Sequence, residues 1–284
     1  MRTYKNFDLT PYNSYRVYSE CTEAVFPETD DDIRWIYSQE DLPKIIIGSG
    51  HNIILSKEFY HSRFIIFSGN FSSVQICGNK IRAQSGVSLL ELSVMTWARG
   101  LSGLEIFYDI PSSLGGAVVM NAGAGGEEIK DSLIRVKYYD PKKDNFYWMD
   151  KDSMSFDYRN SFFQRNPHLL IIEAELELSP KPMNEIRSKM ETTKNKRWEK
   201  QPKNFPNAGS VFKRPNGCFV GPMIEELGLK GYQIGGAQVS EKHAGFIVNK
   251  SNASGSDIVT LIEYLRQKVL EKFSVDLQVE QRII

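Results

Sequence analysis

The sequence predicts an α+β protein of 284 residues, and three observations support this fold class. Short apolar runs bounded by glycine are typical of strands, among them KIII at 44–47 and RFII at 63–66. Two longer segments, at 88–100 and 184–200, carry helix signals instead. The first half also holds too few helices for a doubly wound parallel sheet, in which a helix follows nearly every strand.

The expected strands follow one another along the first 180 residues. EAVFPET at 23–29 is the first, and KIII runs into a glycine-rich turn. SSVQICG and KIRAQSG meet at Gly78-Asn79, a two-residue pair that is typical of a β-hairpin. A second hairpin over 134–150 and a long strand over 169–179 complete this half of the chain.

Two helices in this part are marked by their ends. Ser88 with Glu91 fits a capping box at the start of the first helix, and Gly100 fits its stop. The charged segment 184–200 is predicted to be a second, mostly solvated helix. It ends where two prolines break the pattern, and we place a domain boundary there.

The last third of the chain is predicted to contain two helices and a strand. Pro222 and Gly228 mark the start and stop of a short helix. Ser254 with Asp257 resembles the capping box of a longer one, whose apolar residues share a face. These residues are Ile258, Leu261, Ile262, Leu265 and Val269. The tail from Val275 alternates like a strand.

Charge and composition exclude several classes of protein. Basic and acidic residues both total 35, so the formal net charge is zero, whereas a general nucleic-acid or membrane-surface binder needs a positive excess. No apolar run follows the first positive charges, so we expect no signal peptide. Cys21, Cys77 and Cys218 form no CxxC, and the four histidines show no metal-ligand spacing. We therefore expect a cytoplasmic protein with reduced thiols, no membrane insertion and no metal.

Two glycine-rich stretches raise the question of a nucleotide ligand. GSGHN at 48–52 follows a strand, where glycines let backbone N–H groups approach a phosphate, but the third glycine of the Rossmann fingerprint is missing. DIPSSLGGAVVMNAGAGG at 109–126 surrounds an apolar centre with small residues. An ordinary turn explains the first stretch, and backbone packing explains the second. Taken together, the two stretches favour a nucleotide or dinucleotide ligand and backbone packing equally.

The stretch NAGSVFKRPNG carries a set of reactive groups. Ser210 supplies a hydroxyl that can donate a proton, and Lys213 and Arg214 supply donors suited to phosphate or carboxylate. These residues predict a site for an anionic small molecule. Arg159 in YRNS and Glu280 in the tail, taken alone, are an ordinary surface ion-pair residue and a solvent-facing carboxylate.

All of these stretches together resemble the UDP-N-acetylenolpyruvoylglucosamine reductase family, in order and over nearly the whole chain. IIIGSGHNIILS is similar to the family's strand–GxGSN–L stretch, and GLEIFYDIPSSLGGAVVMNAGAGGEEIKD to its GIPG-S/T-V-GGAVxMNAGAYGxE segment. YRNSFF, QPKNFPNAGSVFKRP, IEELGLKGYQIGGAQVSEKHAGFIVN and LQVE complete the set. No extra insertion follows YRNS, which resembles the family's second type, without a substrate-covering loop.

The resemblance implies an α+β architecture with an FAD-binding fold of the vanillyl-alcohol-oxidase type. That fold has two subdomains and is followed by a C-terminal α+β substrate domain. The corresponding boundaries are 1–44 for the N-terminal FAD-binding subdomain, 45–183 for the second and 184–273 for the substrate-binding domain. The tail 274–284 can return to the first subdomain.

The resemblance also implies tightly bound FAD, contacted by both glycine-rich stretches at its pyrophosphate and ribose. In the first stretch the contacts are Gly48, Ser49, Gly50, His51 and Asn52. Looser candidates in the second are Ser113, Gly115, Gly116, Ala117, Asn121 and Gly123.

The family's catalytic serine, arginine and glutamate fall on Ser210, Arg159 and Glu280. The implied reaction is the NADPH-dependent reduction of UDP-N-acetylglucosamine enolpyruvate to UDP-N-acetylmuramate in peptidoglycan precursor synthesis, with the hydride passing through FAD. Arg159 would stabilise the negative charge that develops on the substrate. Glu280 would hold Arg159 in place, and Ser210 would protonate the α-carbon as general acid.

Further contacts and departures follow from the same resemblance. Lys213 and Arg214 would line the sugar-diphosphate region, and Tyr158 is a further substrate contact. Four residues differ from the family pattern: His51, Ser112, Gly125 and Gly245 replace a serine, a glycine, a tyrosine and an asparagine. Ser112 falls at a tight turn where glycine tolerates positive φ and serine does not do so readily. The departures bear on FAD affinity and its contacts and leave Ser210, Arg159 and Glu280 unchanged.

Two other functions remain open from the sequence. One is another flavin oxidoreductase on the same fold, such as a hydroxy-acid oxidase, and the other is a catalytically silent protein that binds flavin or a nucleotide sugar. An oxidase needs no carbon protonation, so the serine, arginine and glutamate together favour the reductase. We expect the protein to act as a monomer.

Overall fold

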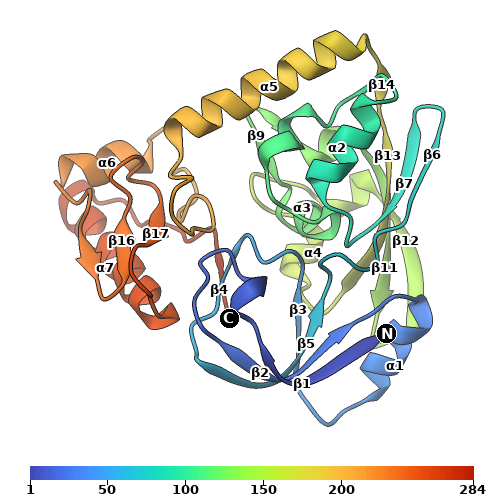
Figure 1. Cartoon of the computed structure of the whole chain (residues 1–284), viewed down its shortest axis with the longest axis horizontal. Helices are drawn as coiled ribbons and strands as arrows, with labels where there is room; N and C mark the ends of the chain where they lie inside the picture. Colours follow the sequence, from blue (N-terminus) through green and yellow to red (C-terminus); the bar gives the residue numbers. More distant parts are fainter. Residues whose placement is uncertain (216) are drawn as a thin grey trace. The chain divides into compact units, whose positions relative to one another are not determined.

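The computed structural model describes residues 1–215 and 217–284, and this chain divides into two compact units (Figure 1). The first unit comprises Met1–Tyr4, Glu23–Ser49 and Ser62–Lys196, and the second comprises Lys5–Thr22, Gly50–His61 and Arg197–Ile284. Each unit therefore combines stretches that are far apart in the sequence. Helices and strands occur in both units, which confirms the α+β class.

A five-stranded antiparallel sheet of order β12-β11-β13-β7-β6 forms the frame of the first unit. Its strands are β6 (Val74–Cys77), β7 (Lys80–Gln84), β11 (Leu133–Asp140), β12 (Asn145–Asp150) and β13 (Leu170–Glu177). β6 and β7 pair directly across Gly78-Asn79, since Cys77 faces Lys80. β11 and β12 also pair with each other, so both predicted hairpins and the predicted long strand are confirmed.

β13 begins with three buried apolar residues, Leu170–Ile172, because both faces of its sheet are covered there, and its second half alternates with glutamates. Ile171 and Leu176 belong to a buried cluster shared with α2 (Leu89–Trp97) and α3 (Leu114–Met120). Ile172 belongs to a second cluster, shared with α1 (Asp30–Ser38). Figure 1 shows α2 and α3 beside this sheet. Each such large aliphatic side chain contributes about 1.5–3 kcal/mol when it is fully buried.

A four-stranded sheet of order β1-β2-β5-β3 carries the first glycine-rich turn. Its strands are β1 (Arg2–Asp8), β2 (Glu20–Phe26), β3 (Lys44–Ile47) and β5 (Phe59–Ile66). β3 and β5 pair in parallel, from Lys44 opposite Arg63 to Ile47 opposite Ile66. β3 therefore ends immediately before the GSGHN turn, as the sequence predicts.

The helices of the first unit were predicted only in part. α2 begins after Ser88, whose hydroxyl accepts a hydrogen bond from the N–H of Glu91, and the chain turns at Gly100 with φ of 66°. The charged helix α5 (Met183–Lys200) is mostly exposed, as expected. α1 and α3 were missed, and so was the short helix α4 (Phe162–Arg165).

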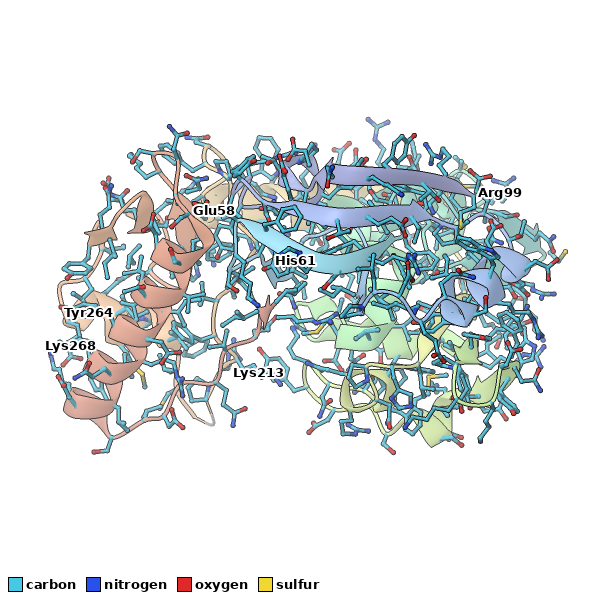
Figure 2. The ribbon with its side chains drawn as sticks, turned by 90° about the horizontal axis from the view of Figure 1, so that it is seen from below. Glu58, His61, Arg99, Lys213, Tyr264 and Lys268 are labelled. Carbon is cyan, nitrogen blue, oxygen red and sulfur yellow. The ribbon has the colours of Figure 1, made fainter. Side chains whose placement is uncertain are left out.

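The second unit is built around α7 (Gly255–Phe273), which packs against α6 (Val220–Glu226) and a small sheet (Figure 1). That sheet contains β15 (Gln233–Ile234), β16 (Ala237–Val239) and β17 (Ile247–Asn249). The capping box of Ser254 and Asp257 and the five buried apolar residues of α7 are confirmed. Tyr264 and Lys268 lie one turn apart on α7 (Figure 2).

The tail is less regular than its alternation predicts. Only β18 (Arg282–Ile283) is a strand, parallel to β4 (Ile53–Ile54), while Val279 forms an isolated bridge with Phe212. Two-residue strands elsewhere form short pairs: β8 (Leu101–Ser102), β9 (Gly123–Ala124), β10 (Glu127–Glu128) and β14 (Ser179–Pro180). In the described part of the chain, 3-10 helices span Thr10–Tyr12, Glu105–Asp109, Ile129–Asp131 and Lys151–Met154.

Within residues 1–215 and 217–284, none of the helices combines the length and the apolar character that crossing a membrane requires.

Candidate active site

In the first unit, the end of β3 meets the start of α3. Ser49 Oγ accepts a hydrogen bond of 3.0 Å from the N–H of Ser113. A Cβ on Gly48 would lie 2.3 Å from Ser113 Oγ, so a larger residue at position 48 would displace the Ser113 hydroxyl. The structure thus brings together Gly48, Ser49 and Ser113, which the sequence assigned to one cofactor from two separate stretches.

The first turn of α3 contains two adjacent glycines whose surroundings differ. The N–H of Gly115 donates to the carbonyl of Ser85 at 2.8 Å, and a Cβ there would lie 2.8 Å from Ser85 Cβ. At Gly116 a Cβ would meet serine hydroxyls, the nearest being Ser113 Oγ at 3.2 Å. Ala117 is fully buried in the apolar cluster of the sheet. Glycine at position 115 is therefore required by packing, whereas Gly116 leaves room for a ligand.

These surroundings fit a cofactor that carries phosphate and ribose. Ser85 Oγ is buried and, within the described part of the chain, has no hydrogen-bond partner. Gly115 lies against Ser85, and the hydroxyls of Ser112 and Ser113 lie beside Gly116, so this region presents glycine backbone and hydroxyl groups that suit a polar ligand. Ser112 does not have a positive φ, so serine is accommodated at this turn without backbone strain.

The remaining residues of the first glycine-rich turn belong to the second unit. Gly50 has φ of 74°, and a Cβ on it would lie 1.9 Å from the carbonyl oxygen of Tyr12. His51 Nδ1 is buried and, among the described residues, unpartnered. Burial, and secondarily the charge of Arg16, lowers the pKa of His51 to about 4, so the ring is neutral at pH 7.

Arg159 lies at the tip of a tight turn in the first unit. Asp157 and Asn160 exchange backbone hydrogen bonds of 3.1 Å, and Arg159 between them has φ of 51°. Its guanidinium donates to the carbonyl of Asn121 at 3.2 Å and to that of Gly123 at 2.6 Å. The Tyr158 ring centroid is 5.0 Å from the same guanidinium carbon. Arg159 is therefore held by the C-terminal end of α3.

A second set of contacts fixes this turn. The Asn121 side chain donates to the carbonyl of Asp157 at 3.0 Å and to Glu128 Oε2 at 2.9 Å. Glu128 Oε1 lies 3.9 Å from Arg159 Nη1. Asn121 and Gly123, predicted as looser FAD candidates, thus contact Arg159. Sequence reasoning missed Glu128, because no pattern distinguishes it from its neighbour Glu127.

Ser210 and Glu280 lie beside each other in the second unit. The N–H of Glu280 donates to the carbonyl of Val211 at 2.8 Å, and the N–H of Lys213 donates to that of Gln278 at 2.9 Å. Ser210 is exposed at the turn that Gly209 forms with φ of 84°. The tail therefore carries Glu280 to the segment that contains the serine hydroxyl, although 70 residues separate them in the sequence.

Asn52, Lys213 and Arg214, which are expected to contact FAD or the substrate, also lie in the second unit. The Asn52 side chain donates to the carbonyl of Glu280 at 3.3 Å. Lys213 is labelled in Figure 2, and the Arg214 guanidinium lies 4.2 Å from the centroid of the exposed Phe219 ring. Within the two described ranges, no group of three or more His, Cys, Asp or Glu residues is arranged to hold a metal.

Comparison with known proteins identifies two matched regions. Residues 23–143 match a family described as an FAD binding domain. Residues 201–284 match the C-terminal domain of UDP-N-acetylenolpyruvoylglucosamine reductase.

Similar proteins cover the whole chain. The UDP-N-acetylenolpyruvoylglucosamine reductase of Syntrophomonas wolfei is 39% identical over 98% of this chain and 94% of its own length. That of Francisella tularensis is 40% identical over 97% and 98%. The crystal structure of the reductase from Thermus caldophilus superposes with a TM-score of 0.84 at 29% identity, covering 99% of this chain and 98% of that one.

Proposed function

The chain belongs to the UDP-N-acetylenolpyruvoylglucosamine reductase family, and we propose that Ser210, Arg159 and Glu280 carry out its reaction. The protein is an FAD-dependent oxidoreductase of peptidoglycan precursor synthesis, which uses NADPH to reduce UDP-N-acetylglucosamine enolpyruvate to UDP-N-acetylmuramate. The expected FAD-binding fold of the vanillyl-alcohol-oxidase type, with a C-terminal α+β domain, is confirmed.

FAD supplies the hydride transfer between NADPH and the enol ether when it is bound. The unpartnered Ser85 hydroxyl and the close backbone approach at Gly48 support binding beside α3. The proposed contacts are Gly48, Ser49, Gly50, His51, Asn52, Ser113, Gly115, Gly116, Ala117, Asn121 and Gly123.

Arg159 is proposed to stabilise the negative charge that develops on the substrate carboxylate and α-carbon. Its guanidinium is already fixed by the carbonyls of Asn121 and Gly123, so it needs little reorganisation when the charge appears. A cation that is oriented beforehand in a partly buried site stabilises a transition state more than a mobile surface cation does. Tyr158, stacked on the guanidinium, is proposed as a substrate contact.

Ser210 is proposed to donate the proton that completes the reduction at the α-carbon. A serine is a weak acid, so this role requires a strongly basic carbon and a fixed hydroxyl. Glu280 is proposed to hold Arg159 and to polarise the substrate carboxylate. The observation that carries this assignment is the backbone pairing of Glu280 with Val211, next to Ser210.

Lys213 and Arg214 follow Ser210 along the chain and are proposed to contact the sugar diphosphate, which suits two cationic donors. We also propose that the protein acts as a monomer. The proposed location is the cytoplasm, where nucleotide sugars are made.

The Ser210→Ala variant tests the assignment, because the two half-reactions can be measured separately. NADPH should still bleach the yellow flavin absorbance at the wild-type rate. Return of the colour on adding UDP-N-acetylglucosamine enolpyruvate should be slower by roughly 10²–10⁴-fold, the usual size of a general-acid contribution. Stopped-flow absorbance measures both steps.

The Ser251→Ala variant is the control, since Ser251 is an exposed serine of the same unit. It should react like the wild type in both steps. Normal rates for Ser210→Ala in both half-reactions would exclude Ser210 as the proton donor. A protein that cannot be loaded with FAD would contradict the flavoenzyme assignment altogether.

A further inference from the structure

Gln281 is a buried polar residue directly after Glu280, with only 4% of its surface exposed. Its side-chain nitrogen donates to three consecutive backbone carbonyls, those of Ala208 at 3.1 Å, Gly209 at 3.2 Å and Ser210 at 3.3 Å. An amide nitrogen has only two hydrogens, so the three carbonyls share them. The Gln281 side chain therefore binds the whole backbone turn that presents Ser210.

Tyr15 fixes which way this amide points. Its hydroxyl donates to Gln281 Oε1 at 2.9 Å, and the ring is fully buried. Burial raises the pKa of the Tyr15 hydroxyl, so the hydroxyl stays protonated and remains a donor. The carbonyls of residues 208–210 can only accept hydrogen bonds. The amide nitrogen must therefore face the Ser210 turn, and its oxygen must face Tyr15.

This contact adds to the backbone pairing that already holds the segment around Ser210. Beyond Ser210, the backbone of the tail bonds directly to the chain, through the N–H of Glu280 and the carbonyl of Val211. On its other side this segment is also paired, since Ser210 forms an antiparallel bridge with Phe246 and the N–H of Val211 donates to the carbonyl of Gly245 at 3.0 Å. The Gln281 side chain extends the contact with the tail to the carbonyls of residues 208–210, where the chain turns at Gly209 with φ of 84°.

Tyr15 is itself anchored within the second unit. Its backbone carbonyl accepts a hydrogen bond of 2.8 Å from the side chain of Asn249, and the Asn249 oxygen accepts from the N–H of Ala253. A chain of buried hydrogen bonds thus leads from the segment before α7, through Tyr15 and Gln281, to the Ser210 backbone. Such fully satisfied buried networks restrict local motion.

We propose that Gln281, oriented by Tyr15, is a positioning residue that holds the Ser210 turn in the conformation required for proton donation. This inference rests on the proposed role of Ser210. Gln281 does not touch the substrate; it restrains the backbone from which the Ser210 hydroxyl projects. A displacement of about 1 Å in a reacting group can reduce a rate by roughly 100-fold, so this restraint is a kinetic requirement for a weak acid such as serine.

The Gln281→Met variant keeps the length and volume of the side chain but removes both donors. Per molecule of bound FAD, flavin reduction by NADPH should stay at the wild-type rate. Reduction of the enolpyruvyl substrate should fall by roughly 10- to 100-fold in kcat with a small change in KM. Tyr15→Phe keeps the ring and should reduce the same step by a smaller factor, about threefold to tenfold. Gln267→Met, at an exposed position of α7, should match the wild type.

The solvent deuterium isotope effect on the substrate step separates positioning from a loss of folded enzyme. Slower proton donation in Gln281→Met should raise the isotope effect, whereas partial unfolding would leave it unchanged. A double-mutant comparison gives a second test: Gln281→Met should cost little further rate when Ser210 is already alanine. Additive losses or an unchanged isotope effect would overturn the inference.

Two outcomes distinguish the proton-donor role of Ser210 from the positioning role of Gln281. If Ser210→Ala retains the wild-type rate with the enolpyruvyl substrate, the proton-donor proposal is wrong and the positioning role falls with it. If Ser210→Ala loses that step while Gln281→Met keeps it, only the positioning role is wrong.

Discussion

Arg159 has a backbone conformation that arginine seldom adopts. Its φ of 51° lies in the left-handed region, which costs a side-chain-bearing residue about 1 kcal/mol and which glycine or asparagine usually occupies in such a turn. Hydrogen bonds from its guanidinium to the carbonyls of Asn121 and Gly123 offset this strain. Strain that the surroundings maintain is typical of residues with a function, which supports the catalytic assignment.

Some of the proposed site residues could be predicted from the sequence, but the residues that hold them in place could not. Ser210, Arg159 and Glu280 stand in stretches that resemble the family, whereas Glu128 and Gln281 act through contacts that depend on the fold. Gln281 does leave a trace in the sequence, because it has the same parity in the tail as the buried Leu277. A polar side chain on the buried side of an alternating segment needs a partner, and only the structure shows which one.

His51 makes the stability of the protein sensitive to acid. Its pKa is lowered from 6.5 to about 4 in the fold, so the folded state resists a proton that the unfolded chain accepts. Stability is therefore fully present above about pH 6.5 and declines as the pH falls towards 4. From pH 7 to pH 5, the loss of unfolding free energy should be about 2 kcal/mol smaller in His51→Gln than in the wild type.

Urea unfolding at both pH values, with saturating FAD, measures this difference. His61→Gln is the matched control, because His61 is an exposed histidine of the same unit (Figure 2). It should lose as much stability on acidification as the wild type. Equal losses in His51→Gln and the wild type would show that His51 is not held neutral by burial.

At the scale of elements, α3 shows how adjacent glycines can serve different purposes. Gly115 is pressed against Ser85, and an added methyl group would overlap the Ser85 side chain and carbonyl. Gly116 faces only the hydroxyls of Ser112 and Ser113. One glycine therefore allows the helix to pack on β7, and the other leaves its outer surface clear.

Alanine substitutions should separate these two roles. Gly115→Ala should lower the free energy of unfolding by about 1–3 kcal/mol, the usual cost of overpacking. Gly116→Ala should change it by less than about 1 kcal/mol, since the gain in helix propensity offsets small adjustments, but should weaken FAD binding by roughly tenfold. Urea unfolding and titration of the apoprotein with FAD measure the two quantities. Wild-type FAD affinity in Gly116→Ala would contradict a cofactor contact there.

The elements that could be predicted were those with strong local signals. Gly78-Asn79 predicted a hairpin, and Ser254 with Asp257 predicted the start of α7, because both patterns act within a few residues. α3 could not be predicted, since its glycines are poor helix formers and packing on β13 and β7 stabilises it instead. α1 was not predicted, although its capping box of Thr29 and Asp32 is a local signal in the sequence.

At the scale of the whole molecule, the division into two units differs from simple consecutive domains. The sequence stretches 1–44, 45–183 and 184–273 remain a prediction for the functional domains, with 274–284 as a returning tail. Both compact units draw on the N-terminal stretch, and composition alone cannot show that. This arrangement depends on contacts between residues that are distant in sequence. Local sequence patterns do not indicate such contacts.

Removal of FAD should lower the stability of the whole protein. A ligand at 100 times its Kd raises the unfolding free energy by about 2.7 kcal/mol, so loss of FAD should lower the melting temperature by roughly 5–10 °C. Differential scanning calorimetry of the flavin-loaded and the flavin-free protein measures the shift. Riboflavin, which lacks the pyrophosphate, should restore less of it than FAD does. Equal recovery with riboflavin would argue against pyrophosphate binding at the glycine-rich turns.

The second unit combines stretches from three parts of the chain, and this limits the order in which the two units can fold during synthesis. Its three stretches are Lys5–Thr22, Gly50–His61 and Arg197–Ile284. The unit therefore cannot fold completely until the last stretch has been synthesised. Most of the first unit is a continuous span, Ser62–Lys196, that can begin folding before then. Glu280 and Gln281 are synthesised after Ser210, so the proposed restraint on the Ser210 turn can form only once the tail has been made. The second glycine-rich stretch, proposed as part of the FAD site, lies within Ser62–Lys196 and can therefore form before the tail is available to the Ser210 turn.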